Sequence, residues 1–514
     1  MDRFPAPSPN KSARPCVESL SGGADEDAAP PDDPDREPDW QQIACALAVR
    51  AALTIVTGGP GTGKTWTVVR VLALLQLLHP DQAERPLRVR LAAPTGKAAQ
   101  RLGESIAAGW QELVESLPDV DLAMPEAAST LHRLLGSQRH TRHFRHDRSN
   151  PLPADVVIVD EASMIDQELM HSLLEALAPA TRLILLGDKD QLASVEAGAV
   201  FGELCRGAEQ VNYSAALNDW LERVLGDRPG ADGAGGLADR RVLLRRNRRS
   251  TPAINTLAVA VNRGDADAAV DLLRRDGDEL DWPTIDATNP NALQAILRAG
   301  YRDYLQAIGQ KRPSEDTPTA EAIDRWAAHC LTAYARFQVL TAHRHGPWGV
   351  DGINGQVHRW LHAARNGKQP AIADGEWFHG RPVMITRNDY ATGLMNGDIG
   401  LCLAVPDNGD TVLRVVFAGA DQHLRYFSPS RLRDCETAWA MTVHKAQGSE
   451  FTHAVLVLPD RPSPVLTREL IYTGLTRARE RFTLIAPSEG VFRQAVRART
   501  RRSSALADRI EDSP

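Results

Sequence analysis

One stretch of the sequence combines glycines with a lysine and a hydroxyl residue at a spacing that suits a polyphosphate. The residues from Gly58 to Thr65 fit the pattern G-x-x-x-x-G-K-[ST]. A glycine-rich backbone can turn its N–H groups toward phosphates, Lys64 can reach the outer phosphates, and the Thr65 hydroxyl can ligate Mg²⁺. We therefore predict that the following residues bind the phosphates of a nucleotide: Gly58, Gly59, Pro60, Gly61, Thr62, Gly63, Lys64 and Thr65.

The segments on either side of this loop predict how it is held. Residues 53–56 form an apolar run that reads as a strand, and residues 68–78 read as a helix. Apolar residues also recur at helical spacing in residues 40–50. Gln41, near the start of that helix, could read the adenine edge because an amide both donates and accepts hydrogen bonds. The alternatives are a glycine-rich turn with an accidental lysine and a solvated surface glutamine.

Paired carboxylates end another apolar run, residues 156–159. We expect Asp160 to hold Mg²⁺ through water and Glu161 to polarise the attacking water. Gln191 follows a further buried strand, residues 183–186, and could sense the γ-phosphate by hydrogen bonding. A polar turn is the alternative for Gln191.

Two arginines could stabilise negative charge on a transferring phosphoryl group. Arg249 lies in the arginine-rich run 245–250, and Arg477 lies in residues 469–479, which read as a helix. A guanidinium suits this task because its planar fork clamps phosphate and stays charged. The first run could instead be a solvated basic face.

Two further segments place hydroxyl groups beside cations. Thr95 and Lys97 lie where a strand leads into a helix, and His132 lies in a similar cluster, residues 129–135. Exposed backbone N–H groups, a hydroxyl and a cation together suit a nucleic-acid phosphate. Alone, such a segment is more often a simple helix cap.

Composition limits the class of protein. The 514 residues are too many for one core, and 43% hydrophobic with 24% charged residues is ordinary for a soluble globular protein. Residues 1–38 carry a net charge of −5, which leaves −2 for the rest of the chain. A nearly neutral body can still carry a basic groove, so the net charge does not exclude DNA binding. We expect this acidic leader to be disordered. We also expect that the chain has no membrane helix and that the protein is cytoplasmic. The six cysteines are scattered, which favours free thiols over a zinc site or disulfides.

Changes in pattern along the chain predict its domain organisation. The glycine-rich residues 226–238 read as a flexible loop or linker, and residues 264–336 are mostly helical in pattern. A buried strand resumes at 339–342. Between about 346 and 435, short β runs separated by Asn-Gly and Gly-Ala turns predict a small β barrel.

The order and the amino-acid sequences of these segments resemble the motifs of superfamily-one helicases. They are most similar to those of the RecD family, the alpha subunits of exodeoxyribonuclease V. The resemblance covers about residues 39–505. It rests on these segments: APTGKAAQRL, STLHRLLG, VDEASMID, GDKDQLASVEAG, NRRS, GRPVMITRND, LMNGDIG, AMTVHKAQGSEF and RELIYTGLTRAR.

The resemblance implies an α/β fold with two RecA-like P-loop domains, ATP between them, single-stranded DNA across them and 5′ to 3′ translocation. The first domain is expected at 39–240 and the second at 241–345 and 436–505, with an SH3-like insert at 346–435 and a tail at 506–514. By family role, these residues match positions of the nucleotide site: Lys64, Thr65, Asp160, Glu161, Gln191, Arg249, Gly448, Glu450 and Arg477. Thr95, His132 and Thr442 match positions that contact the DNA strand.

The resemblance also implies partners. Family members work with RecB-type beta and RecC-type gamma subunits on single-stranded and duplex-end DNA. No lysine here is preceded two positions earlier by Asp or Glu, so the D/E-x-K signature of metal nucleases is absent and cutting is expected from the beta subunit. An acidic leader stands where relatives carry a domain that docks on the gamma subunit. A stand-alone accessory helicase and a non-catalytic assembly subunit are the alternatives.

Overall fold

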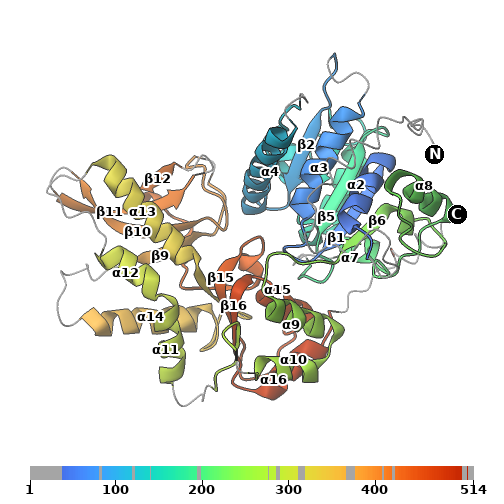
Figure 1. Ribbon diagram of the computed structural model, residues 1–514. Helices are drawn as coiled ribbons and strands as arrows, with labels where there is room; N and C mark the ends of the chain where they lie inside the picture. Colours follow the sequence, from blue (N-terminus) through green and yellow to red (C-terminus); the bar gives the residue numbers. More distant parts are fainter. Residues whose placement is uncertain are drawn as a thin grey trace. The chain divides into compact units, whose positions relative to one another are not determined.

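The computed structural model describes residues 37–79, 84–117, 122–138, 141–193, 198–275, 277–284, 290–310, 319–365, 377–389, 391–407, 410–419, 423–500 and 506. The expected leader, except residues 37 and 38, and the expected tail, except residue 506, lie outside these described residues. Within them, the chain divides into two compact units, one of residues up to Arg249 together with Leu506 and one running from Ser250 to Arg501 (Figure 1).

The first unit contains a six-stranded parallel sheet in the order β3-β2-β4-β5-β1-β6. Its strands are β1 (Leu53–Gly58), β2 (Val89–Ala93), β3 (Ser129–Thr130), β4 (Val156–Val159), β5 (Arg182–Gly187) and β6 (Arg241–Leu244). Its helices are α2 (Trp40–Arg50), α3 (Lys64–Leu77), α4 (Gly96–Ser116), α5 (Leu131–Leu134), α6 (Gln167–Ala176), α7 (Val200–Leu204) and α8 (Ala215–Leu225), with the 3₁₀ turns η1 (Ala162–Met164) and η2 (Ala238–Arg240).

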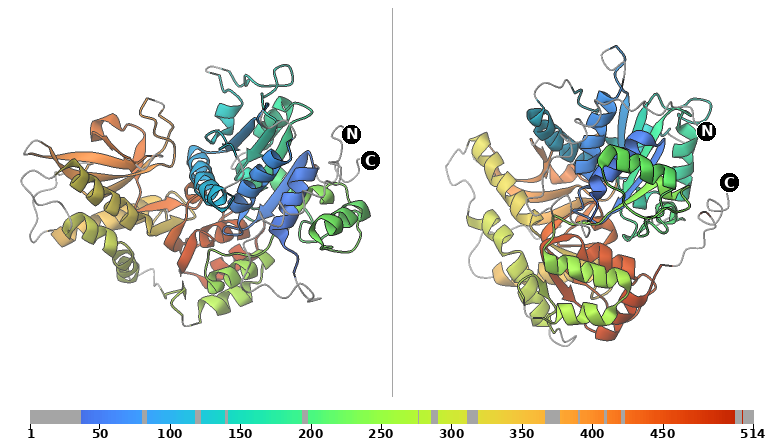
Figure 2. Two further views of the ribbon diagram at one scale, coloured as in Figure 1. Left: turned by 45° about the horizontal axis from the view of Figure 1, so that its top comes forward. Right: turned by 45° about the vertical axis from the view of Figure 1, so that its right-hand side comes forward.

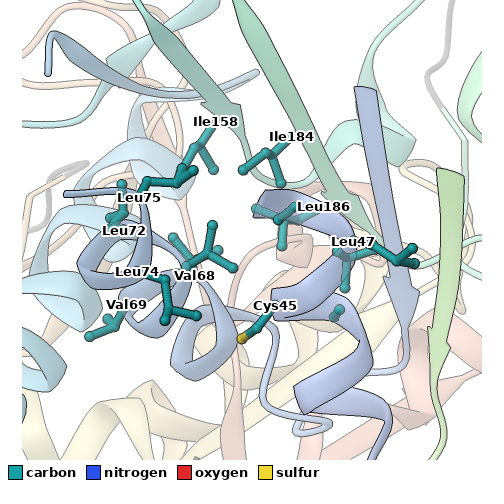
Figure 3. Close-up of a cluster of buried hydrophobic side chains, with 14 of the residues drawn as sticks. Cys45, Leu47, Val68, Val69, Leu72, Leu74, Leu75, Ile158, Ile184 and Leu186 are labelled. Carbon is teal, nitrogen blue, oxygen red and sulfur yellow. The ribbon is translucent and has the colours of Figure 1, made fainter. Parts of the chain in front are cut away.

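Helices cover both faces of this sheet because successive strand residues point to opposite sides. Ile158, Ile184 and Leu186 pack against α2 and α3 on one face, as Figure 3 shows. Their neighbours Val157 and Leu185 pack against η1, α6 and α7 on the other. The predicted helix at 40–50, the strand before the loop and the strand before the paired acids are therefore confirmed.

The second unit contains a parallel sheet in the order β14-β8-β15-β16-β7 and an antiparallel sheet in the order β12-β11-β10-β9-β13. The parallel strands are β7 (Leu280–Asp281), β8 (Phe337–Thr341), β14 (Ala440–Thr442), β15 (Phe451–Val457) and β16 (Ala478–Ile485). The antiparallel strands are β9 (Arg381–Ile385), β10 (Ile399–Asp407), β11 (Asp410–Ala418), β12 (Leu424–Phe427) and β13 (Cys435–Thr437). The helices are α9 (Pro252–Arg263), α10 (Ala266–Leu273), α11 (Pro290–Gly300), α12 (Arg302–Gln310), α13 (Ala320–Ala335), α14 (Val350–Arg365), α15 (Arg468–Leu475) and α16 (Glu489–Arg497), with the 3₁₀ turns η3 (Pro429–Arg431) and η4 (His444–Ala446).

The antiparallel sheet is the insert that the short β runs predicted, and it agrees with an SH3-like fold. Helix α13 lies against β10 and β11 (Figure 2). There Trp326 and Cys330 join a core with Leu401 and Val416. One part of the expected β region differs: its first described part is the helix α14 rather than a strand.

The first unit also extends beyond the expected boundary at residue 240. Strand β6 pairs with β1 in the first sheet, and the unit ends at Arg249. The glycine-rich segment 226–238, expected to be a flexible loop or linker, is a loop within the first unit rather than a linker between the two units. The Gly233 N–H donates to the Tyr213 carbonyl at 2.7 Å, and a Cβ at Gly233 would overlap the Asn212 backbone, so this loop packs within the first unit.

Two expectations about residue classes can be compared with the described chain. The five described cysteines are free thiols, and four of them are buried. Burial raises the pKa of the Cys45 thiol to about 12, which keeps it protonated. In the part of the chain that the structure describes, no helix combines the length and the apolar character needed to cross a membrane.

Candidate active site

The glycine-rich loop joins β1 to α3, as its flanking pattern predicted. Gly61 and Gly63 adopt left-handed backbone with φ of 80° and 87°, which favours glycine. Lys64 opens α3, and its ammonium donates to the carbonyl oxygens of Gly58 at 2.7 Å and Gly59 at 3.1 Å. The Thr62 hydroxyl donates to the same Gly59 carbonyl at 2.8 Å. The loop therefore curls around the lysine and starts a helix whose positive end suits an anion.

Gln41 lies directly against this loop. Its side-chain amide donates to the Thr62 carbonyl at 3.1 Å, and a Cβ at Gly63 would overlap that amide. The start of α2 is fixed because the Asp39 carboxylate accepts from the backbone N–H groups of Gln41 and Gln42. Gln41 is thus a buried loop contact rather than a solvated surface residue, and its reading of adenine stays a prediction.

The paired acids lie at the carboxyl end of β4, where ligands bind in open α/β sheets. The Asp160 N–H donates to the Ala92 carbonyl at 2.9 Å, and its carboxylate accepts from the Glu161 N–H at 2.8 Å. Glu161 has a φ of 51°, and among the described residues it is the only non-glycine with positive φ. Such backbone costs about 1–3 kcal/mol and clusters at functional sites.

Burial of the Asp160 carboxyl raises its pKa, while the Lys64 ammonium and the Glu161 N–H act in the opposite direction. A folded-state pKa above the unfolded value means that the folded chain binds the extra proton. Stability from this group is therefore full below the unfolded pKa and is lost as pH rises through the folded pKa.

We expect Asp160→Asn to raise the free energy of unfolding of the nucleotide-free protein at neutral pH. The amide keeps the acceptor for the Glu161 N–H but removes a charge whose burial is unfavourable. Urea unfolding at a series of pH values checks this: the gain should shrink as the solution is acidified. A loss of stability at neutral pH that shrinks on acidification would show instead that ionised Asp160 stabilises the fold.

Gln191 is buried in the turn after β5. Its amide donates to the Asp188 carboxylate at 3.0 Å, while its own oxygen is buried and has no hydrogen-bond partner among the described residues. An unpaired buried acceptor costs about 1–3 kcal/mol. The neighbouring Lys189 N–H donates to the Thr57 hydroxyl at 3.3 Å, which ties this turn to the strand before the phosphate-binding loop. This placement supports the sensing role predicted for Gln191, which stays a prediction.

Arg249 lies at the end of the first unit, and its segment contacts the phosphate-binding loop. The Arg248 N–H donates to the Gly61 carbonyl at 3.0 Å, and the Asn247 side chain accepts from the Arg249 N–H at 2.9 Å. A Cβ at Gly61 would overlap both Asn247 and the Cβ of Arg249. Asn247 is a residue that the sequence reasoning missed, although its place before two arginines could have signalled it.

The second unit holds the other arginine rigidly. Helix α15 ends at Leu475, so Arg477 follows the helix instead of lying in it, as its sequence pattern had suggested. Its buried guanidinium donates to the carbonyl oxygens of Thr473 and Ser449, both at 3.1 Å. The structure thus joins Arg477 to the loop of Gly448 and Glu450, where Gly448 has a φ of 69°.

Two of the expected strand-contacting residues act as helix caps or turn acceptors. The Thr95 hydroxyl accepts from the Ala98 N–H at 3.2 Å and caps α4, whose first turn includes Lys97. The Thr442 hydroxyl accepts from the Lys445 N–H at 3.4 Å. The exposed His132 on α5 packs edge-on against Phe144, with 5.8 Å between the ring centroids. The capping alternative thus holds for Thr95, and contact with DNA stays a prediction for all four.

Comparison with known proteins adds to this geometry. Residues 41–197 match the model of an AAA domain, and residues 437–485 match that of a UvrD-like helicase C-terminal domain. The chain is 39% identical over 489 residues to the RecBCD enzyme subunit RecD of Haemophilus influenzae, covering 92% of this chain and 72% of the relative. This chain belongs to the RecD family. The RecD subunit of Mycolicibacterium smegmatis is 38% identical, with 91% of this chain and 74% of that one covered.

The comparisons also give more distant similarities. The ATP-dependent RecD2 DNA helicase of Deinococcus radiodurans is 31% identical, covering 89% of this chain and 50% of that one. A solved structure of Pif1 helicase from Bacteroides with ADP-AlF3 and single-stranded DNA is 15% identical, with a TM-score of 0.45 and coverage of 92% and 96%. As a RecD-family protein, this chain is an ATP-dependent DNA helicase that binds nucleotide and DNA.

Proposed function

We propose that this chain is the 5′ to 3′ motor subunit of a RecBCD-type complex, acting in the cytoplasm on DNA ends with a RecB-type beta and a RecC-type gamma subunit. The observation that carries the proposal is the identity of 39% across 72% of a RecBCD enzyme subunit. The preserved geometry of the phosphate-binding loop and paired acids supports a working motor over a non-catalytic assembly subunit.

In the proposed hydrolysis site, the loop N–H groups and Lys64 hold the phosphates of ATP. Glu161 accepts a proton from the attacking water, and its positive φ is the kind of strained backbone that clusters at functional sites. The hydroxyl of Thr65 and the carboxylate of Asp160 are hard oxygen ligands, which fit Mg²⁺ bound partly through substrate phosphates. When bound, Mg²⁺ would neutralise charge that develops on those phosphates.

The roles proposed for the two arginines rest on how each is held. Arg249 is exposed, but its backbone is tied to Gly61 through its neighbours Asn247 and Arg248. Arg477 is held by backbone carbonyl oxygens, which leave its positive charge unneutralised by any carboxylate in these contacts. Both can therefore stabilise the charge of a transferring phosphoryl group.

Unwinding of tailed duplexes tests the motor assignment. We expect the purified chain to unwind a duplex with a 5′ single-stranded tail in the presence of ATP, and not one with a 3′ tail. A complex in which Lys64 is replaced by Gln isolates this motor from any partner's. Unwinding of 3′ tails only would contradict the proposed direction.

Co-purification tests the assembly. Tagged chain expressed with beta- and gamma-type subunits should bring both down in equal amounts. If the chain elutes alone and unwinds 5′-tailed DNA without partners, a stand-alone accessory helicase replaces the complex subunit as the assignment. Assembly and DNA binding that survive while hydrolysis is absent from the wild-type chain would favour the non-catalytic subunit.

A further inference from the structure

A cluster of three charged side chains in the second unit lies outside the nucleotide site. The Glu436 carboxylate accepts from the Arg344 guanidinium through one oxygen and from the Lys445 ammonium through the other, each at 2.7 Å. The Glu436 side chain is 17% exposed, whereas those of Arg344 and Lys445 are 53% and 30% exposed. One largely covered anion therefore holds two cations that solvent can still reach.

The three residues come from different parts of the fold. Strands β8 and β14 are parallel neighbours, and Arg344 and Lys445 each stand three residues beyond the end of one of them. Glu436 belongs to β13 of the antiparallel insert, where it pairs with Met384. The carboxyl edge of two parallel strands is where open α/β sheets bind ligands. The insert thus supplies the carboxylate that occupies this edge.

The chemistry of the cluster suits a phosphate diester. Two cations against one carboxylate leave a net positive charge, and a phosphate oxygen can replace a carboxylate oxygen on both a guanidinium and an ammonium. Thr442, which is expected to contact the DNA strand, also accepts from the Lys445 N–H. A phosphate at this edge would therefore lie beside a residue already expected to touch the strand.

The backbone around Glu436 is fixed, so only its side chain has to move. The Asn354 amide donates to the Thr437 carbonyl at 2.9 Å and its oxygen accepts from the Ala440 N–H at 2.9 Å. The Arg381 guanidinium donates to the Thr437 hydroxyl at 3.0 Å. These bonds anchor the segment between β13 and β14 without using the Glu436 carboxylate.

We propose that Arg344 and Lys445 form a binding site for a backbone phosphate of single-stranded DNA, and that Glu436 occupies this site as a competing anion until DNA displaces it. The proposal rests on the proposed function of the chain as a DNA motor, and it adds a carboxylate gate that controls access of DNA to one phosphate-binding site. Because the gate belongs to the insert, every DNA strand that enters must break two contacts between the insert and the parallel sheet.

Glu436→Gln tests the gate. Removing the competing charge should tighten binding of single-stranded DNA about two- to fivefold at low salt, because ion pairs of partly exposed cations contribute modestly and a phosphate no longer has to displace the carboxylate. Arg344→Gln and Lys445→Gln should each weaken binding and lower the slope of log affinity against log salt by about 0.7. Fluorescence anisotropy of a labelled oligonucleotide, titrated with the full chain at several salt concentrations, measures both quantities.

The controls separate this gate from general effects. Asp407→Asn removes the same charge from another insert ion pair, that with Arg414 at 3.0 Å, and should leave DNA binding unchanged. Binding of a labelled ATP analogue without DNA should be the same in all four variants, which distinguishes a DNA phosphate from a nucleotide phosphate. Thermal unfolding confirms that each variant is folded.

Weaker DNA binding by folded Glu436→Gln would show that the carboxylate only positions the two cations, and would overturn the gate. Unchanged salt slopes for both Arg344→Gln and Lys445→Gln would overturn the phosphate site. Failure of the proposed motor function is a different result, because the wild-type chain would then show no ATPase stimulated by DNA.

Discussion

Replacing Lys64 with Gln should lower DNA-stimulated ATP hydrolysis by at least about a hundredfold, a loss typical for removing one group that stabilises charge in the transition state. The Lys64 ammonium lies inside the phosphate-binding loop, 2.7 Å from the Gly58 carbonyl and 3.1 Å from that of Gly59. A glutamine amide can donate to one of these carbonyl oxygens, but it carries no charge to offer the outer phosphates. Turnover with saturating single-stranded DNA, measured by phosphate release, checks the prediction.

The matched control for Lys64→Gln is Arg85→Gln, which removes one positive charge from a side chain that is 72% exposed in the same unit. Arg85→Gln should keep full activity. DNA binding without nucleotide should persist in Lys64→Gln, because the substitution does not touch the expected strand contacts. Full ATPase activity in a folded Lys64→Gln protein would remove the basis for placing the nucleotide at this loop.

Replacing Arg249 with Ala should lower the turnover number on the order of a thousandfold, by analogy with other arginines that stabilise a phosphoryl transition state. Arg249 is exposed, so its loss should leave the fold intact. Its backbone N–H is held by Asn247, and the preceding N–H by the Gly61 carbonyl, so the alanine variant should keep the loop geometry. The KM for ATP should therefore change much less than kcat.

Arg240→Ala is the control for Arg249→Ala, because Arg240 is an exposed arginine of the same unit outside the loop contacts. It should behave as the wild type in steady-state ATPase assays. A large rise in KM with unchanged kcat for Arg249→Ala would instead make Arg249 a residue for ground-state binding. Unchanged kinetics would mean that Arg249 belongs to a solvated basic face.

Much of the first unit's chemistry could be predicted because it depends on short stretches of sequence. Glycines at 61 and 63 allow the left-handed backbone of the loop, and the apolar strand before it and the helix after it are set by local periodicity. The same holds for Asp160, which ends an apolar strand. The two parallel sheets of the fold class were implied by the resemblance to the helicase family and are confirmed.

Some boundaries were decided by pairing that no local pattern records. The short strand β6 joins the first sheet through β1, and Arg477 lies beyond α15 because its guanidinium bonds carbonyl oxygens at the end of that helix and in the loop before β15. The glycines of 226–238 left a flexible loop and a linker open, and the structure has a loop in which Gly233 packs against the backbone of Asn212. Glycine reports conformational freedom in a sequence, and it equally permits close packing in a fold.

The sequence by itself therefore determined which groups can do chemistry: the loop lysine, the acids that end β4 and the arginines. Only the tertiary structure decided what holds them and what competes for them. The contacts of Asn247 with Gly61 and of Glu436 with Arg344 each join residues more than ninety positions apart. The contact of Glu436 with Lys445 joins two neighbouring segments that belong to different sheets. Such contacts depend on chain folding over long distances, whereas a motif depends on neighbours whose spacing the backbone fixes.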